Sequence, residues 1–127
     1  MIKYSRQREE ILKNLQSRRD HPTSEMIYES VRKTQPNISL GTVYRNLSLL
    51  AENGQILKIS TGLGADRFDG FTEPHNHFIC RCCGKVYDME YVSSAEILEK
   101  ASKSFGGVVE DCEIQFFGTC EPCLLSE

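Results

Sequence analysis

Histidine, cysteine and aspartate are concentrated in the stretch EPHNHFICRCCGKVYD, residues 73–88. The stretch holds two of the chain's three histidines, three of its six cysteines and a closing aspartate. All three residue types bind metal ions, but a single ion cannot use so many ligands. The chemistry to be expected here is metal binding, and the question is how many ions bind and which residues serve each.

The cysteines predict a tetrahedral zinc site with four thiolate ligands. Cys80 and Cys83 form one C-x-x-C pair, and Cys120 and Cys123 form another. Two such pairs are the usual frame of a structural zinc site, because each tight turn offers two thiolates. Residues 84–119 separate the pairs. This is more than a zinc ribbon usually has, so a further element must fold between them.

Two cysteines remain outside this frame. Cys82 is not at the spacing that matches the downstream pair, so we interpret it as the odd residue of the cluster. Cys112 alternates with Ile114 and Phe116 along an apolar face, which predicts a buried thiol in the core.

The histidines predict a second metal site. His75 and His77 are two positions apart in a segment expected to be extended, so their rings point the same way, whereas Cys80 has the opposite parity. The candidates for completing this site are Asp69, Asp88 and the remaining histidine, His21. Imidazoles with carboxylates suit Fe(II), Mn(II) or Zn(II) rather than an ion that prefers thiolates. His21 precedes a proline, and a surface residue at a helix start is the alternative interpretation.

The charge distribution divides the chain. The net charge of −3 alone argues against nucleic acid as a partner. Residues 1–60 carry 10 Lys/Arg against 6 Asp/Glu, giving +4, and residues 61–127 carry 5 against 12, giving −7. A basic nucleic-acid-binding half joined to an acidic half has this pattern. The first ten residues have no apolar run, so we expect no signal peptide, no membrane span and a cytoplasmic location.

The basic half predicts three helices and a hairpin. The helices cover residues 5–15, residues from the cap Thr23 onward, and residues 40–53 after the cap Ser39. In the third helix an inward stripe is expected from Leu40, Val43, Leu47 and Leu50. Arg45 falls on the opposite side, flanked by Thr42 and Leu49, and Tyr44 and Asn46 lie on the borders. A helix-turn-helix presents such residues to the DNA major groove, and the hairpin of residues 56–60 and 65–69 would be the wing. A plain three-helix bundle with a solvated arginine is the alternative.

The acidic half predicts one further helix, over residues 93–105. Ser93 and Glu96 have the spacing of a capping box, and Gly106 and Gly107 would close the helix. We expect it to pack on a small sheet between the two C-x-x-C turns.

At this point the motifs resemble a known family. HPTSEMIY, ISLGTVYRNLSLLAENG, DRFDG, HNHFICRCCGKVYD and CEPC, in this order, resemble the ferric-uptake regulator family and, more closely, its peroxide-sensing, PerR-type branch. The resemblance runs from about Ser5 to Cys123. It implies an α+β chain, with a winged helix-turn-helix DNA-binding domain in residues 1–70 and a small α/β dimerisation and metal-sensing domain in residues 71–127. The segment YSRQREEIL resembles the family's second helix, and the usual first helix is missing.

The resemblance also assigns ligands, residue by residue. It implies a structural zinc on Cys80, Cys83, Cys120 and Cys123. It implies a regulatory Fe(II) or Mn(II) on His21, Asp69, His75, His77 and Asp88. Position 88 indicates the branch, because iron-uptake regulators typically have glutamate there and peroxide sensors have aspartate.

Together these observations predict a homodimeric, metal-dependent repressor that binds an inverted-repeat DNA operator and senses peroxide. An iron-uptake or other metal-uptake repressor of the same family is the alternative within this class. The rival from another class is an enzyme, because two histidines with carboxylates resemble the facial triad of non-haem iron oxygenases. Against the rival, the ligands are many for an open catalytic site and no substrate-pocket motif is visible.

Overall fold

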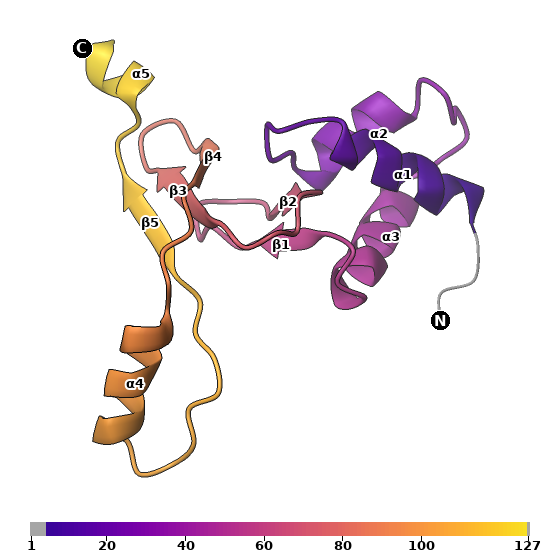
Figure 1. Ribbon diagram of the computed structural model, residues 1–127. Helices are drawn as coiled ribbons and strands as arrows, with labels where there is room; N and C mark the ends of the chain where they lie inside the picture. The colour runs from indigo at the N-terminus through magenta and orange to yellow at the C-terminus, as the bar shows by residue number, and fades with distance from the viewer. Residues whose placement is uncertain (1–4, 127) are drawn as a thin grey trace. The chain divides into compact units, whose positions relative to one another are not determined.

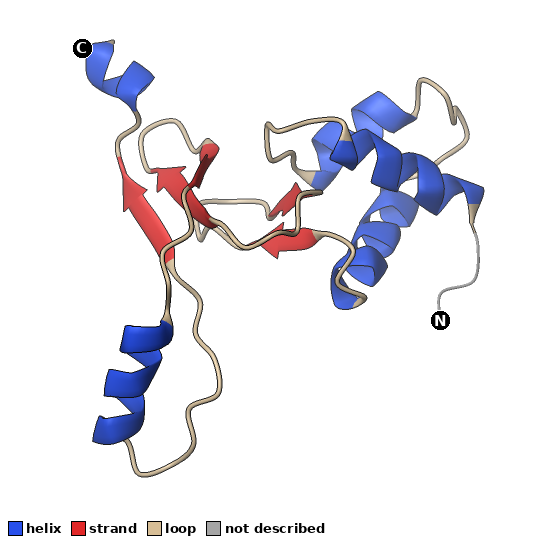
Figure 2. Cartoon of the chain, viewed as in Figure 1, coloured by secondary structure: helices blue, strands red, loops and turns tan. Residues whose placement is uncertain are grey.

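The computed structural model describes residues 5–126 and has mixed α+β architecture. The chain forms two compact units, Met1–Glu73 and Pro74–Glu127. Three of the helices belong to the first unit, and each unit has its own antiparallel strand pairing (Figures 1 and 2). Within residues 5–126, no helix combines the length and the apolar content needed to cross a membrane.

The three helices of the first unit begin where the sequence predicts. They are α1 (Arg6–Gln16), α2 (Ser24–Val31) and α3 (Leu40–Glu52). Each follows a hydroxyl residue whose side-chain oxygen accepts a hydrogen bond from a backbone N–H in the first turn: Ser5, Thr23 and Ser39. These caps satisfy donors that have no partner within the helix.

The three helices and the hairpin share one hydrophobic core. Its buried members are Ile11, Leu15, Ile27, Val31, Ile38, Val43, Leu47, Leu50, Ile56 and Phe68. The predicted inward stripe of α3 is confirmed at three positions and wrong at Leu40, which is 40% exposed. A stripe gives a direction around the helix axis but does not tell where along the axis the neighbouring elements end. Leu40 is the first residue of α3 and lies outside the buried part.

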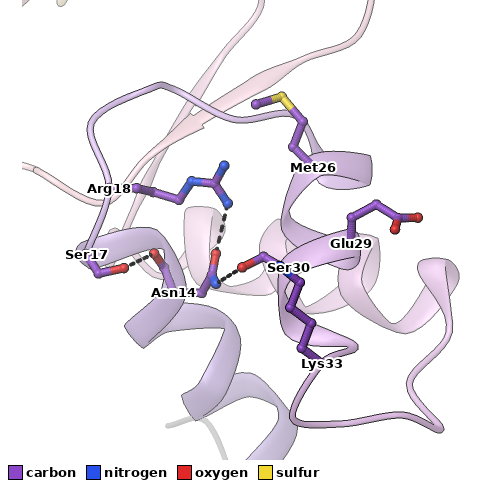
Figure 3. A pocket seen from close by; sticks show the side chains of 7 residues that line it. All are labelled: Asn14, Ser17, Arg18, Met26, Glu29, Ser30 and Lys33. Carbon is purple, nitrogen blue, oxygen red and sulfur yellow. Dashed lines mark hydrogen bonds between the residues drawn. The ribbon is translucent and has the colours of Figure 1, made fainter.

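Polar contacts fix α1 against α2. The Asn14 side-chain amide donates to Ser30 Oγ at 2.7 Å, and its oxygen accepts from the Arg18 guanidinium at 3.2 Å (Figure 3). Arg18 is also paired with Asp20, with N–O distances of 2.7 Å. Asn14, Arg18, Ser30 and Lys33 are among the residues that line a polar hollow (Figure 3). The Arg18 guanidinium is thus already paired with Asp20, and the Asn14–Ser30 hydrogen bond joins α1 to α2.

The predicted hairpin is confirmed. Its strands, β1 (Leu57–Ile59) and β2 (Arg67–Asp69), are antiparallel, with Lys58 opposite Phe68. The Phe68 N–H donates to the Pro22 carbonyl at 2.9 Å, which attaches the hairpin to the chain before α2. At Gly70 a Cβ would lie 3.0 Å from backbone atoms of Gln16, so a residue without a side chain is needed where the chain passes α1.

The second unit is built on a three-stranded sheet. Its elements are β3 (Asn76–Cys80), β4 (Val86–Met89), α4 (Ala95–Ser104), β5 (Gln115–Gly118) and α5 (Glu121–Leu125). The strand order is β4-β3-β5, with β4 antiparallel and β5 parallel to the central β3. The parallel partner needs a long crossover, which supplies the element predicted between the two cysteine pairs.

The prediction for α4 is partly wrong. A helix does form, but its N-cap is Ser94 and no side-chain cap hydrogen bond is present; Ser93 Oγ accepts from the Ala95 N–H instead of forming the predicted capping box. No residue of α4 is buried, so within this single chain it does not pack on the sheet as expected. Its apolar side, including Ile97 at 49% exposure, is therefore available to another molecule.

Candidate metal centres and nucleic-acid interface

The four cysteines of the two C-x-x-C pairs come together in the second unit. The sulfurs of Cys80, Cys83, Cys120 and Cys123 all lie within 4.8 Å of one another. Two of the sulfur–sulfur distances, Cys80 to Cys123 and Cys83 to Cys120, are 3.8 Å. A tetrahedron with a zinc–sulfur bond of about 2.3 Å has edges of about 3.8 Å. A disulfide requires about 2.05 Å, so these are free thiols at the spacing that a zinc ion requires.

Local structure positions each pair. After Cys80 ends β3, the chain turns at Gly84, whose φ of 78° is in the left-handed region, and its N–H donates to the Cys80 carbonyl at 2.9 Å. Cys120 is the N-cap of α5 and Cys123 lies within that helix. Residues three apart at a helix start share one side, so both thiols point toward the first pair.

The closely spaced thiols and the backbone N–H groups around them shift the pKa values of the cysteines. Backbone N–H groups, first that of Cys120 and then that of Cys83, lower the pKa of Cys80 to about 6. The pKa of Cys123 is raised, mainly by its interaction with the neighbouring Cys120 side chain. Four thiolates cannot coexist at this spacing without a cation, so the cluster has the chemistry of a metal site rather than of a reactive thiol.

The two remaining cysteines lie outside the four-sulfur group. Cys82 is exposed in the turn between Cys80 and Cys83. Cys112 is half-buried and precedes β5, so the prediction of a buried core thiol is wrong for this chain. The alternation was read correctly, but the face on which Cys112 lies is only partly covered within one chain.

The second unit also brings His75, His77 and Asp88 together. His77 and Asp88 are directly opposite each other on β3 and β4. Asp88 Oδ1 lies 3.1 Å from His75 Nε2 and 3.5 Å from His77 Nε2, and the two ring nitrogens are 3.0 Å apart. Both histidine side chains are nearly buried. Two imidazole nitrogens and a carboxylate oxygen at these distances are a partial site for a divalent cation.

The first unit holds the other two predicted ligands of the regulatory set. His21 Nε2 lies 3.4 Å from Asp69 Oδ2, and both side chains are buried. The interpretation of His21 as a surface residue is therefore wrong. Its backbone adopts φ 50°, unusual outside glycine, and Arg67 donates to its carbonyl at 3.2 Å. Strand β2 thus supplies both the Asp69 carboxylate beside the His21 ring and the Arg67 side chain that donates to the His21 carbonyl.

The sheet of the second unit separates its two groups of ligands. His77 and Asp88 form one cross-strand pair, and Phe78 and Tyr87 form the next. Because successive side chains point to opposite faces, the histidine pair is on one face, and Phe78 and Tyr87 are on the face of Cys80. The predicted difference in parity is confirmed in the geometry, and two separate metal sites are compatible with it.

Sequence reasoning missed Tyr87 as a neighbour of the sulfur cluster. Tyr87 and Cys120 both line one hollow, and the interaction of the tyrosine hydroxyl with the Cys120 thiol is the main cause that lowers the pKa of Cys120 and raises the pKa of Tyr87 to about 12. The signal that could have found it is parity, since Tyr87 is one residue before Asp88 and so faces away from the histidines.

The outward side of α3 carries polar side chains in the first unit. Tyr44 and Arg45 are exposed, and Thr42 and Asn46 are half-buried. Arg45 donates to Thr42 Oγ1 at 3.1 Å, and the Asn46 amide donates to the Thr42 carbonyl at 3.0 Å. These bonds lie along one face of the helix and preorder donors that could reach base edges.

Comparison with known proteins agrees with this geometry. The family model of the ferric uptake regulator family matches residues 1–117. The peroxide operon regulator of Bacillus subtilis is 33% identical over 126 residues, covering 99% of this chain and 87% of that protein. The Campylobacter jejuni peroxide stress regulator structure is 32% identical, with a TM-score of 0.74 over 92% of this chain and 88% of that one. The Helicobacter pylori ferric uptake regulator structure, described as having three functional metal-binding sites, is 27% identical, with a TM-score of 0.81 over 97% and 83%. The chain belongs to the ferric uptake regulator family.

Proposed function

We propose that this chain is a metal-dependent, DNA-binding transcriptional repressor that senses peroxide through a regulatory Fe(II) or Mn(II) site and carries a structural zinc. The observation that carries the proposal is the His75, His77 and Asp88 cluster, in which the aspartate typical of the peroxide-sensing branch directly faces a histidine. Relatives named as peroxide regulators at 33–34% identity support the same branch.

The structural zinc is assigned to Cys80, Cys83, Cys120 and Cys123. The support is the sulfur spacing, which matches a tetrahedral site. In the second unit, the buried apolar and sulfur side chains are Ile79, Cys80, Val86 and Cys120. A core this small needs additional stabilisation, and a bound zinc ion supplies it.

The regulatory ion is assigned to five ligands, His21, Asp69, His75, His77 and Asp88. The support is that each unit preassembles its share of the set, with nitrogen and oxygen donors suited to Fe(II) or Mn(II). An ion held by ligands from both units would favour one arrangement of the DNA-binding part, and its binding energy would shift the population toward the DNA-competent form. When bound, ferrous iron would supply the electron that cleaves peroxide.

The DNA-binding part is the first unit, acting as a winged helix-turn-helix. In this proposal α3 is the recognition helix, with Thr42, Tyr44, Arg45 and Asn46 at the DNA, and β1 and β2 form the wing. The support is the outward placement of these side chains and the excess of basic residues in this part of the chain.

The functional form is a homodimer on an inverted-repeat operator, in the cytoplasm. The second unit exposes apolar side chains that a dimer would cover, including Phe105 at 61% exposure and Val108 at 83%. A two-fold dimer presents two recognition helices symmetrically, which requires a two-fold symmetric DNA site.

A gel-retardation assay tests this function. Protein loaded with Fe(II) or Mn(II) should retard an operator fragment, and metal-free protein should not. Brief exposure to peroxide should release the DNA only from the iron form. The rival, an oxygenase-like enzyme, predicts repeated turnover of peroxide without retardation. An iron-uptake repressor, the alternative within the family, predicts retardation that follows Fe(II) concentration and ignores peroxide.

Arg45 tests the orientation of α3. Replacing Arg45 by alanine should weaken operator binding by about 1–3 kcal/mol and reduce the preference for operator over random DNA, since an arginine that reads a base edge contributes this much. Fluorescence anisotropy with both DNAs measures the ratio. Arg32→Ala, which removes an exposed arginine from the turn after α2, is the matched control and should leave the ratio unchanged. An unchanged ratio in the Arg45 variant would make this arginine only a phosphate contact.

A further inference from the structure

His21 has an unusual backbone conformation. Within residues 5–126 it is the one residue other than glycine whose φ is positive, at 50°. In this left-handed region the Cβ of an L-residue lies too close to the following carbonyl oxygen. Pro22 follows, and a proline favours extended backbone at the residue before it. His21 is therefore held in a conformation that both its own side chain and the next residue disfavour, so the surrounding structure must stabilise it.

Strand β2 supplies contacts that hold this segment. Arg67 Nη1 donates to the His21 carbonyl at 3.2 Å, and the Phe68 N–H donates to the Pro22 carbonyl at 2.9 Å. Thr23, the N-cap of α2, forms an antiparallel bridge with Arg67. The backbone contacts fix the residues after His21, whereas the guanidinium acts on the His21 carbonyl itself. Because this oxygen belongs to the peptide plane that follows His21, holding it restrains the His21 backbone.

The same strand also faces the His21 ring. Arg67 and Asp69 are two positions apart on β2 and so share one face, while Phe68 between them is buried in the core. Asp69 Oδ2 lies 3.4 Å from His21 Nε2, and both side chains are buried. Arg67 is half-buried, and a charged donor there makes a strong hydrogen bond. One strand thus restrains the His21 backbone and presents a carboxylate oxygen to its ring.

We propose that Arg67 is a positioning residue of the regulatory metal site, whose guanidinium keeps the His21 backbone in the left-handed region and its ring beside Asp69. The proposal rests on the proposed function, in which His21 and Asp69 are regulatory ligands, and it adds a residue that is not itself a ligand. Arg67 offsets the strain at His21 when the chain folds, so the ion does not have to supply that free energy when it binds.

Arg67→Met tests this role, because it removes the guanidinium and keeps an unbranched side chain. In this variant the His21 backbone should relax toward the extended region, so that only a fraction of the molecules holds the ring in the binding position. Mn(II) affinity, measured by electron paramagnetic resonance of the free ion during titration of zinc-loaded protein, should fall about 10- to 100-fold, as the strain of a left-handed residue predicts.

A second measurement needs no regulatory ion. The Cα and Cβ chemical shifts of His21 report its backbone conformation in zinc-loaded protein without Mn(II). They should be those of a left-handed residue in the wild type and move toward extended values in Arg67→Met. Arg67→Lys keeps a charged donor and should recover part of the Mn(II) affinity. Because methionine and lysine have similar unbranched stems, the difference between the two variants measures the donor rather than packing.

Lys58→Met is the matched control. Lys58 is exposed on β1 of the same hairpin and is paired with Asp66 at 3.4 Å. Its replacement removes the same charge from the same hairpin, so Mn(II) affinity and the His21 shifts should both stay unchanged. His21→Ala removes a ligand and should lower Mn(II) affinity at least as much as Arg67→Met does.

Each outcome decides the proposal. Wild-type Mn(II) affinity or unchanged His21 shifts in Arg67→Met would overturn it. So would an unfolded first unit, detected by circular dichroism, because Arg67 would then be needed for the fold and not for His21. If His21→Ala binds Mn(II) as tightly as the wild type, the ligand assignment of the proposed function is wrong, and the positioning role fails with it. The His21 shifts, which need no Mn(II), distinguish this case from a missing Arg67 contact.

Discussion

Replacing Cys123 by serine is expected to abolish zinc binding and unfold the second unit. Cys123 Sγ lies 3.8 Å from Cys80 Sγ, and the pair links α5 to the end of β3. Structural zinc contributes about 10–16 kcal/mol in small zinc domains, which is as large as the whole stability of a typical domain, about 5–15 kcal/mol. With so few buried side chains in the second unit, nothing else replaces this contribution. Metal analysis by mass spectrometry measures the zinc content, and limited proteolysis measures the unfolding of residues 74–127.

The same experiment with the other two cysteines provides its controls. Cys82→Ser and Cys112→Ser remove one sulfur each but leave the four-sulfur group intact, so both should keep one zinc per chain and remain protease-resistant. Loss of zinc from the Cys82 variant would mean that the first pair has been assigned to the wrong cysteines.

Replacing Asp88 by glutamate is expected to keep metal-dependent DNA binding and remove the response to peroxide. Asp88 Oδ1 lies 3.1 Å and 3.5 Å from the ring nitrogens of His75 and His77. An added methylene moves the carboxylate relative to both rings, and a displacement of about 1 Å can slow a positioned reaction by about 10²-fold. Glutamate keeps a carboxylate donor within reach of the ion, so binding can persist, whereas oxidation of a neighbouring ring depends more strictly on how the ion is positioned.

Mass spectrometry measures this prediction on iron-loaded protein after modest peroxide. The wild-type protein should gain one oxygen atom, supplied by the peroxide, on His21 or His75, and it should lose operator binding. The manganese-loaded protein should show no change in mass and should remain bound to the operator. Asp111→Glu, the same change at an exposed aspartate of the same unit, should behave as the wild type. The competing route is oxidation of the exposed Cys82 thiol. If the added oxygen is confined to cysteine peptides, the histidine mechanism is excluded and a thiol switch takes its place.

Much of the local structure was already determined by short-range patterns. Hydroxyl residues before apolar stripes located the starts of two helices, at Thr23 and Ser39, because a cap acts on donors within the next turn. The two-residue period of a strand placed His75 and His77 together and Cys80 on the other face, because side chains of a strand must alternate.

Only the tertiary structure decided which distant groups meet. The exposure of Leu40 and of α4, the half-buried state of Cys112 and the position of Tyr87 in the same hollow as Cys120 all depend on how far neighbouring elements extend. The periodicity of a helix or strand determines which way each side chain points, but it does not determine which other segment that side chain contacts. Burial and long-range hydrogen bonds are properties of pairs of segments, so one segment's residues determine which face is presented, and the packing of the chain determines what that face contacts.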